Sequence, residues 1–183
     1  MPRKGYMPKY SRTKFPLTVD AQKLLIESLK GKEYDSERTL TILMISTGMH
    51  PLVLAEPQIH ALAWNPNYAE WKRPKTSVQI HVNWSLAMKE VLPYLGALKG
   101  CTRQWYWDIV KSAGKAGGIS GLCPLQLRHT HFVNLARMGY SESDLRIESG
   151  TNQNTISHHY LTGLREIKRL TPEDKVFLEW LMT

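Results

Sequence analysis

The sequence Gln126-Leu127-Arg128-His129-Thr130 stands near the start of a helix that we predict over residues 124–138. Further along the chain, His158-His159-Tyr160 closes a second helix predicted over residues 152–161. The spacing of apolar residues predicts both helices. The two stretches place a permanently charged arginine before a tyrosine hydroxyl. A guanidinium group binds phosphate oxygens well, because its N–H donors form a planar fork.

The charge of the chain favours the same kind of ligand. Its 183 residues include 24 Lys and Arg against 16 Asp and Glu, which gives a net charge of +8. With 42% hydrophobic residues there is enough apolar material for one folded domain. A strongly basic folded domain is typical of proteins that bind a polyanion, and duplex DNA is the partner we predict first.

Three segments can be distinguished along the chain. Residues 1–16 form a basic arm that has no acidic residue and is expected to be flexible. Residues 17–170 are predicted to be the folded domain, and residues 171–183 a C-terminal helix. No apolar run is long enough to span a membrane, and the two cysteines do not suggest disulfides. These features favour a cytoplasmic protein.

The predicted fold class is mainly α with a small antiparallel β-sheet (α+β). Asp20 is expected to cap a helix over residues 21–29, and a second helix runs from Asp35 or Ser36 towards Gly48. Residues 77–82 alternate polar with apolar, as a half-buried strand does, and a basic turn at residues 72–75 leads into them. Further helices are predicted at 84–95, 102–115, 124–138, 142–148, 152–161 and 172–182.

Two further short pieces precede these stretches: Thr47-Gly48-Met49-His50 at a helix end and Pro74-Lys75-Thr76 at the hairpin tip. In this order the pieces resemble the catalytic domain of tyrosine recombinases, the family of phage-type integrases. The resemblance covers residues 17–165, and it implies the tyrosine recombinase catalytic-domain fold. It also implies the family's chemistry, in which a tyrosine attacks a DNA phosphodiester.

Three residues match the family pattern directly. The resemblance implies that Tyr160 is the nucleophile, Arg128 the second phosphate-binding arginine, and Lys75 the lysine that protonates the leaving oxygen. A tyrosine hydroxyl has an ordinary pKa near 10, so nearby cations or a base must activate it at neutral pH.

Three other positions depart from the pattern. His50 stands where the first arginine belongs, Leu125 where the family has the histidine of its H-x-x-R, and Thr151 where it has a histidine or tryptophan. A protonated His50 carries charge and donates hydrogen bonds, but it lacks the bidentate reach of an arginine. Thr151 still donates a hydrogen bond, whereas Leu125 does not.

The predicted function is therefore a DNA-binding site-specific recombinase or integrase domain, which breaks and rejoins duplex DNA by tyrosine transesterification. The alternative is a catalytically impaired accessory protein that binds DNA and retains the recombinase fold. The family implies self-association as a tetramer on DNA, with residues 171–183 as the exchanged segment. The resemblance implies no cofactor, and we expect no membrane and no small-molecule ligand. We also expect no metal, because the histidine pairs lack zinc-ligand spacing. The residues predicted to contact DNA are Lys72, Arg73, His129, His131, His158 and His159.

Overall fold

The computed structural model describes residues 16–50, 53, 65–72, 79–98, 102–150 and 169–183. Its principal elements are α1 (Val19–Ser28), η2 (Lys32–Tyr34), α2 (Asp35–Thr47), β1 (Tyr68–Lys72), β2 (Gln79–Asn83), α5 (Leu86–Val91), η3 (Leu92–Leu98), α6 (Arg103–Ala116), α7 (Pro124–Arg137), α8 (Glu142–Ser149) and α11 (Pro172–Met182). The mainly helical fold with a small antiparallel sheet confirms the predicted fold class. In the described ranges no helix is long and apolar enough to cross a membrane.

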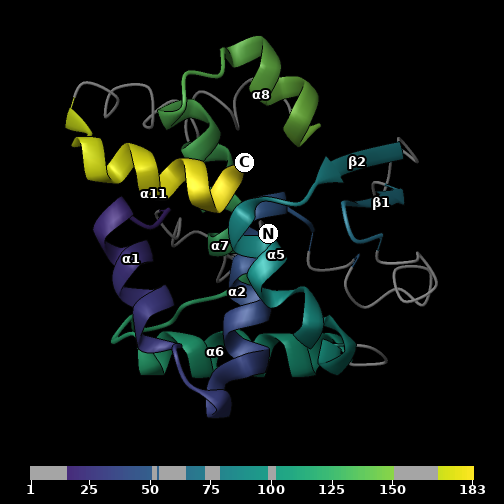
Figure 1. Ribbon diagram of the computed structural model, residues 1–183, viewed down its shortest axis with the longest axis vertical. Helices are drawn as coiled ribbons and strands as arrows, with labels where there is room; N and C mark the ends of the chain where they lie inside the picture. The colour runs from purple at the N-terminus through teal and green to yellow at the C-terminus, as the bar shows by residue number, and fades with distance from the viewer. Residues whose placement is uncertain (1–15, 51–52, 54–64, 73–78, 99–101, 151–168) are drawn as a thin grey trace, which may run out of the picture.

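Helix α2 is the central element of the fold. It packs against α5, α6, α7 and α11, and Figure 1 shows α6 across one of its ends and α11 near the other. A helix with apolar residues around most of its surface is stable only when other elements cover it. The fully buried apolar residues of α2 are Leu40, Ile42, Leu43, Met44 and Ile45.

The predicted start of the first helix needs a correction. Thr18, rather than Asp20, is the N-cap of α1, because the Thr18 hydroxyl accepts a hydrogen bond from the amide of Ala21 at 3.2 Å. Asp20 lies in the first turn, where its negative charge still complements the positive end of the helix. The end of the second helix was predicted correctly: Gly48 caps α2 in the left-handed conformation.

The helix predicted over residues 84–95 is shorter than expected and changes type. An α-helix covers only Leu86–Val91, and a 3₁₀ helix continues over Leu92–Leu98. Pro93 stands at the start of that 3₁₀ stretch, and proline has no amide hydrogen with which to continue an α-helical ladder.

The sheet is a hairpin of two antiparallel strands, β1 and β2. Strand β2 confirms the described part of the strand predicted over residues 77–82. Strand β1 was missed, because Ala69, Glu70 and Lys72 are residue types that strands disfavour. Ala69 and Trp71 of β1 are buried, and Glu70 on the other face pairs with His81 at 2.9 Å. The hairpin lies at one side of the helical body (Figure 1). Residues 73–78, which join its strands, lie outside the described ranges.

Helix α11 packs on the same chain from which it comes. It contacts α1, α2, α5 and α7, and its Leu178 and Leu181 are buried. Asp174 pairs with Lys23 of α1 at 2.6 Å, and the indole N–H of Trp180 donates to a Glu90 carboxylate oxygen at 2.8 Å. Exchange of residues 171–183 between subunits stays a prediction.

Helix α7 is tied to the beginning of the domain by a buried polar network. The hydroxyl of Thr130 accepts a hydrogen bond from the amide of Leu17 at 2.9 Å. Asn134 exchanges hydrogen bonds with Gln22 of α1, and Arg137 donates to the Leu17 carbonyl at 3.1 Å. These polar residues are at most 4% exposed, and their buried polar groups find hydrogen-bond partners in one another and in the Leu17 backbone. The network fixes the position of α7 relative to α1.

Candidate active site

Arg128 lies where the ends of two helices meet α7. Its Nη1 donates to the carbonyl of Gly48, the C-cap of α2, and its Nη2 donates to the carbonyl of Ser149, the last residue of α8, at 3.2 Å. The C-terminal ends of helices carry partial negative charge and carbonyls without helical partners. A positive guanidinium group therefore stabilises both helix ends at once.

The ring of Phe132 forms another wall of this junction. The guanidinium carbon of Arg128 lies 4.8 Å from the ring centroid, a distance at which cation–π attraction contributes. Phe132 is buried and Arg128 is half-buried, so the guanidinium group lies at the edge of the interior. A guanidinium group has five N–H donors, and the two carbonyl bonds fix its plane.

The junction brings together two of the sequence pieces, Thr47–His50 and Gln126–Thr130, with the end of α8. His50, two residues beyond Gly48, is half-buried, and its carbonyl accepts a hydrogen bond from the Val53 amide at 2.8 Å. Gly150 follows Ser149 and directly precedes the position of Thr151. The end of α2, the first turns of α7 and the end of α8 thus meet around one arginine.

Glycine ends both helices for the same reason. Gly48 has φ 60° and Gly150 has φ 61°, left-handed conformations that strain any residue with a Cβ. Gly48 has a second constraint, because a Cβ added to it would lie 2.3 Å from Cδ2 of His131. The T-G signal in the sequence therefore marks a helix cap that a side chain of α7 approaches closely.

His131 does not fit the DNA-contact role predicted for it. Its side chain is buried, with 7% of the residue exposed, and its Nδ1 lies 2.8 Å from the carbonyl oxygen of Ile45. Burial, and secondarily the charge of Arg128, lower the pKa of His131 to about 3. The imidazole is therefore neutral at physiological pH and belongs to the interior between α7 and α2.

The other predicted residues of α7 lie nearer the surface. His129 is half-buried, and Leu125 in the first turn is 42% exposed. An exposed leucine neither donates nor accepts hydrogen bonds, so Leu125 adds no polar group at the position where the resemblance places a histidine.

The basic end of the hairpin is described only in part. Lys72, the last residue of β1, is exposed. Most of the remaining predicted site residues fall outside the described ranges: Arg73, Lys75, Thr151, His158, His159 and Tyr160. In the described part of the chain no three His, Cys, Asp or Glu side chains come together as a group that could hold a metal ion.

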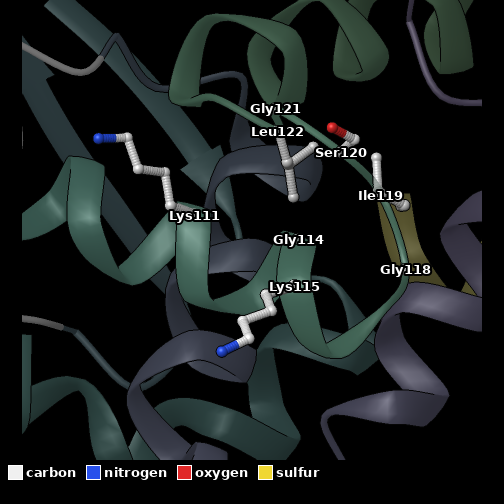
Figure 2. Close-up of a pocket in the computed structure, with 8 residues that line it drawn as sticks. All are labelled: Lys111, Gly114, Lys115, Gly118, Ile119, Ser120, Gly121 and Leu122. Carbon is white, nitrogen blue, oxygen red and sulfur yellow. The ribbon is translucent and has the colours of Figure 1, made fainter.

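A basic surface hollow of about 360 Å³ lies between the end of α6 and the loop that leads to α7 (Figure 2). Lys111 and Lys115 of α6 border it, and both are exposed. Lys111 also lies 3.8 Å from a carboxylate oxygen of Asp108. None of the described residues that line the hollow is among the predicted site residues. Its lining is Lys111, Gly114, Lys115, Gly118, Ile119, Ser120, Gly121 and Leu122.

No protein-family model and no curated protein matches this sequence. The structure, however, is similar to solved site-specific recombinases. XerA recombinase superposes with a TM-score of 0.65 at 19% identity, over 85% of this chain and 64% of that one. XerH recombinase, in a post-cleavage complex with a palindromic difH substrate, gives 0.63 at 15% identity over 87% and 54%. A lambda integrase dimer bound to a COC′ core site gives 0.56 at 18% identity over 80% and 59%.

These neighbours are tyrosine recombinases, so the chain has a tyrosine recombinase catalytic-domain-like fold, as the sequence predicted. The chain spans between 54% and 64% of the length of the three structures. Sequence reasoning missed the main-chain partners of Arg128, which are the carbonyls of Gly48 and Ser149. Only the glycine that caps each helix signalled that a helix ends there.

Proposed function

We propose that this domain, with its tyrosine recombinase catalytic-domain-like fold, binds duplex DNA and breaks and rejoins one strand through a covalent bond to Tyr160. The observation that carries the proposal is the fixed guanidinium group of Arg128 at the junction of α2, α7 and α8. An arginine whose plane is set before the substrate arrives stabilises developing phosphate charge without the cost of reorganisation.

The proposed reaction is a transesterification at phosphorus. The Tyr160 oxygen forms a bond to phosphorus while the bond from phosphorus to the 5′ oxygen breaks, which leaves a 3′-phosphotyrosine. The tyrosine proton passes to His158 or His159, and Lys75 donates a proton to the leaving 5′ oxygen. The reverse steps rejoin the strand, so the number of phosphodiester bonds is conserved.

The phosphate would be held by three side chains. Arg128 supplies a permanent charge and a fixed fork, His50 supplies charge only when it is protonated, and Thr151 supplies a neutral donor. This set has one guanidinium group, where the family pattern has two. The proposal therefore includes a cleavage rate that depends on the protonation of His50.

DNA contacts beyond the scissile phosphate are proposed for the hairpin and the N-terminal arm. Lys72 is exposed at the end of β1, and the sequence continues with Arg73 and Lys75. Residues 1–16 contain five basic residues: Arg3, Lys4, Lys9, Arg12 and Lys14. Lysines and arginines bind the DNA backbone largely without regard to sequence, so they add affinity rather than specificity.

A second candidate function is duplex DNA binding without chemistry. The exposed Leu125 favours it, because this position on the first turn of α7 offers no group for proton transfer. A domain of this kind would bind DNA through the same basic residues and form no covalent intermediate.

A covalent-adduct assay separates the two functions. The protein is incubated with nicked duplex DNA from its own genomic neighbourhood, and denaturing electrophoresis detects protein joined to DNA. We expect an adduct from the wild type and none from Tyr160→Phe, with DNA affinity nearly unchanged. Tyr140→Phe is the matched control, because Tyr140 is an exposed tyrosine of the described structure. DNA binding without an adduct would select the non-catalytic alternative, and an adduct in Tyr160→Phe would show that another residue is the nucleophile.

A further inference from the structure

The end of α2 is held by two side chains of α7. The last carbonyls of any helix lack helical partners and need donors from elsewhere. At this end the amide of Gly48 closes the last turn on the Met44 carbonyl at 3.1 Å. The Ile45 carbonyl lies 2.8 Å from Nδ1 of His131, and the Gly48 carbonyl accepts from Arg128. One helix thus supplies donors to two carbonyls of its neighbour.

The hydrogen bond to Ile45 determines the tautomer of His131. A carbonyl oxygen only accepts hydrogen bonds, so Nδ1 of the imidazole must carry the hydrogen. Because the ring is buried and its pKa is about 3, it keeps this form over the whole pH range in which DNA is handled. His131 is therefore a constant donor, unlike a surface histidine.

The same ring also fills the space in front of Gly48. An added Cβ on Gly48 would lie 2.3 Å from Cδ2 and 2.9 Å from Nε2 of His131. The imidazole therefore occupies the volume that any side chain at position 48 would need. The backbone of Gly48 and the ring of His131 restrict each other, and the Gly48 carbonyl is one of the two that orient Arg128.

We propose that His131 is a positioning residue for Arg128. His131 donates a hydrogen bond to the Ile45 carbonyl and packs against Gly48. These contacts hold the Gly48 carbonyl in the position where it accepts from the guanidinium group of Arg128. Arg128 and His131 are one helical turn apart and face the same end of α2. Their hydrogen bonds to the Gly48 and Ile45 carbonyls therefore hold this helix end together. The catalytic part of this inference rests on the proposed function, in which Arg128 binds the scissile phosphate. The structural part concerns the order of Gly48 and Arg128 alone.

Two substitutions separate the donor of His131 from its volume. His131→Phe keeps an aromatic ring and removes the N–H group, whereas His131→Asn places an amide N–H close to the position of Nδ1. At saturating nicked duplex DNA we expect His131→Phe to slow adduct formation about tenfold to a hundredfold, with DNA affinity changed less than about threefold. His131→Asn should restore most of the rate. If His131→Phe does not fold, His131→Leu serves as the variant without a donor.

Thr130→Val is the matched control for a loss of stability. Thr130 neighbours His131 on α7 and is fully buried, but its hydroxyl accepts from the Leu17 amide and does not reach α2 in any described contact. Its substitution should lower the melting temperature and leave the cleavage rate per folded molecule unchanged. An equal loss of rate in Thr130→Val and His131→Phe would overturn the positioning role.

An NMR measurement tests the inference without any enzymatic activity. We expect His131→Phe to accelerate hydrogen exchange at the Gly48 amide and at the Arg128 side chain at least about tenfold, since a freed helix end opens locally. Exchange in His131→Asn and Thr130→Val should stay close to wild type. Unchanged exchange in His131→Phe, or an Asn variant no better than Phe, would refute the proposal. If the wild type forms no adduct, the proposed reaction fails while the exchange data still decide the role of His131.

Discussion

Two arginines of helix α7 bind main-chain carbonyls in different settings. Arg137 is 4% exposed, and its Nη1 donates to the Leu17 carbonyl at 3.1 Å and to the Asn134 side chain at 2.8 Å. Arg128 is half-buried, and it reaches two helix ends, at Gly48 and Ser149. The first arginine lies inside the network that joins α7 to the start of the domain. The second lies at the edge of the interior.

The difference shows that an arginine bound to carbonyls can either stabilise the fold or be a candidate ligand for phosphate. Both side chains are oriented by the backbone, but Arg137 is enclosed within its network. Arg128 stands at the end of α2, two residues before His50, and at the end of α8, where its positive group is only half-buried. Burial, rather than hydrogen bonding, separates the structural arginine from the candidate phosphate ligand.

The largest expected effect tests Arg128. Arg128→Ala should lower the rate of adduct formation about 10²- to 10³-fold, because a preorganised donor to the developing phosphate charge is lost. Arg128→Lys keeps the charge but not the fork and should recover only part of the rate. The measurement is adduct formation on nicked duplex DNA at saturation. A rate within twofold of wild type in Arg128→Ala would remove the contrast between the two arginines.

The next effect tests Arg137. Arg137→Met should lower the free energy of unfolding by about 1–3 kcal/mol, since the Leu17 carbonyl and the Asn134 side chain lose a buried donor. Urea denaturation measures this change. The cleavage rate per folded molecule should stay at the wild-type value. A selective loss of rate without a loss of stability would place Arg137 in the site instead.

A pH-dependent effect follows from the neutral state of His131. Its pKa is about 3 in the folded protein, below the ordinary value near 6.5 that the unfolded chain has. The unfolded state therefore binds more protons as pH falls below 6.5, and the stabilising contribution, complete above that pH, is lost progressively towards pH 3. The free energy of unfolding should fall by up to about 1.4 kcal/mol per pH unit from this group.

His131→Phe removes the titrating group and should flatten this part of the pH dependence. Denaturation series between pH 4 and pH 7 compare the variant with the wild type and with His129→Phe, the half-exposed neighbour. An unchanged slope in His131→Phe would mean that other groups cause the pH dependence.

The smallest effect concerns the position that the resemblance gives to an arginine. His50→Arg should raise the cleavage rate about tenfold at pH 7.5, because only about a tenth of an ordinary histidine is protonated there. Near pH 6 the gain should shrink, and the variant should lose the preference of the wild type for lower pH. Adduct formation measured from pH 6 to pH 8 checks both points. A variant with the wild-type rate and pH profile would show that His50 does not reach the phosphate.

Much of the helical fold could be predicted from local sequence. Apolar spacing predicted α6, α7 and α8 to within a residue or two at each end, because a helix that buries one face must repeat apolar residues at its own period. Gly48 was a visible end of α2, since glycine adopts the left-handed cap at little cost. Strand β1 was missed, because Ala69, Glu70 and Lys72 in Tyr68–Lys72 are residue types that strands disfavour.

The sequence by itself determined the fold class, because local periodicity is written in the residues. Its resemblance to tyrosine recombinases implied the candidate catalytic residues, which stay predictions. Only the tertiary structure decided that Arg128 is bound by Gly48 and Ser149, and that His131 is buried beside Ile45. These partners are backbone carbonyls, which every residue carries and no residue type marks. Their direction depends on where α2 and α8 end relative to α7, and that relation comes from packing across the whole domain.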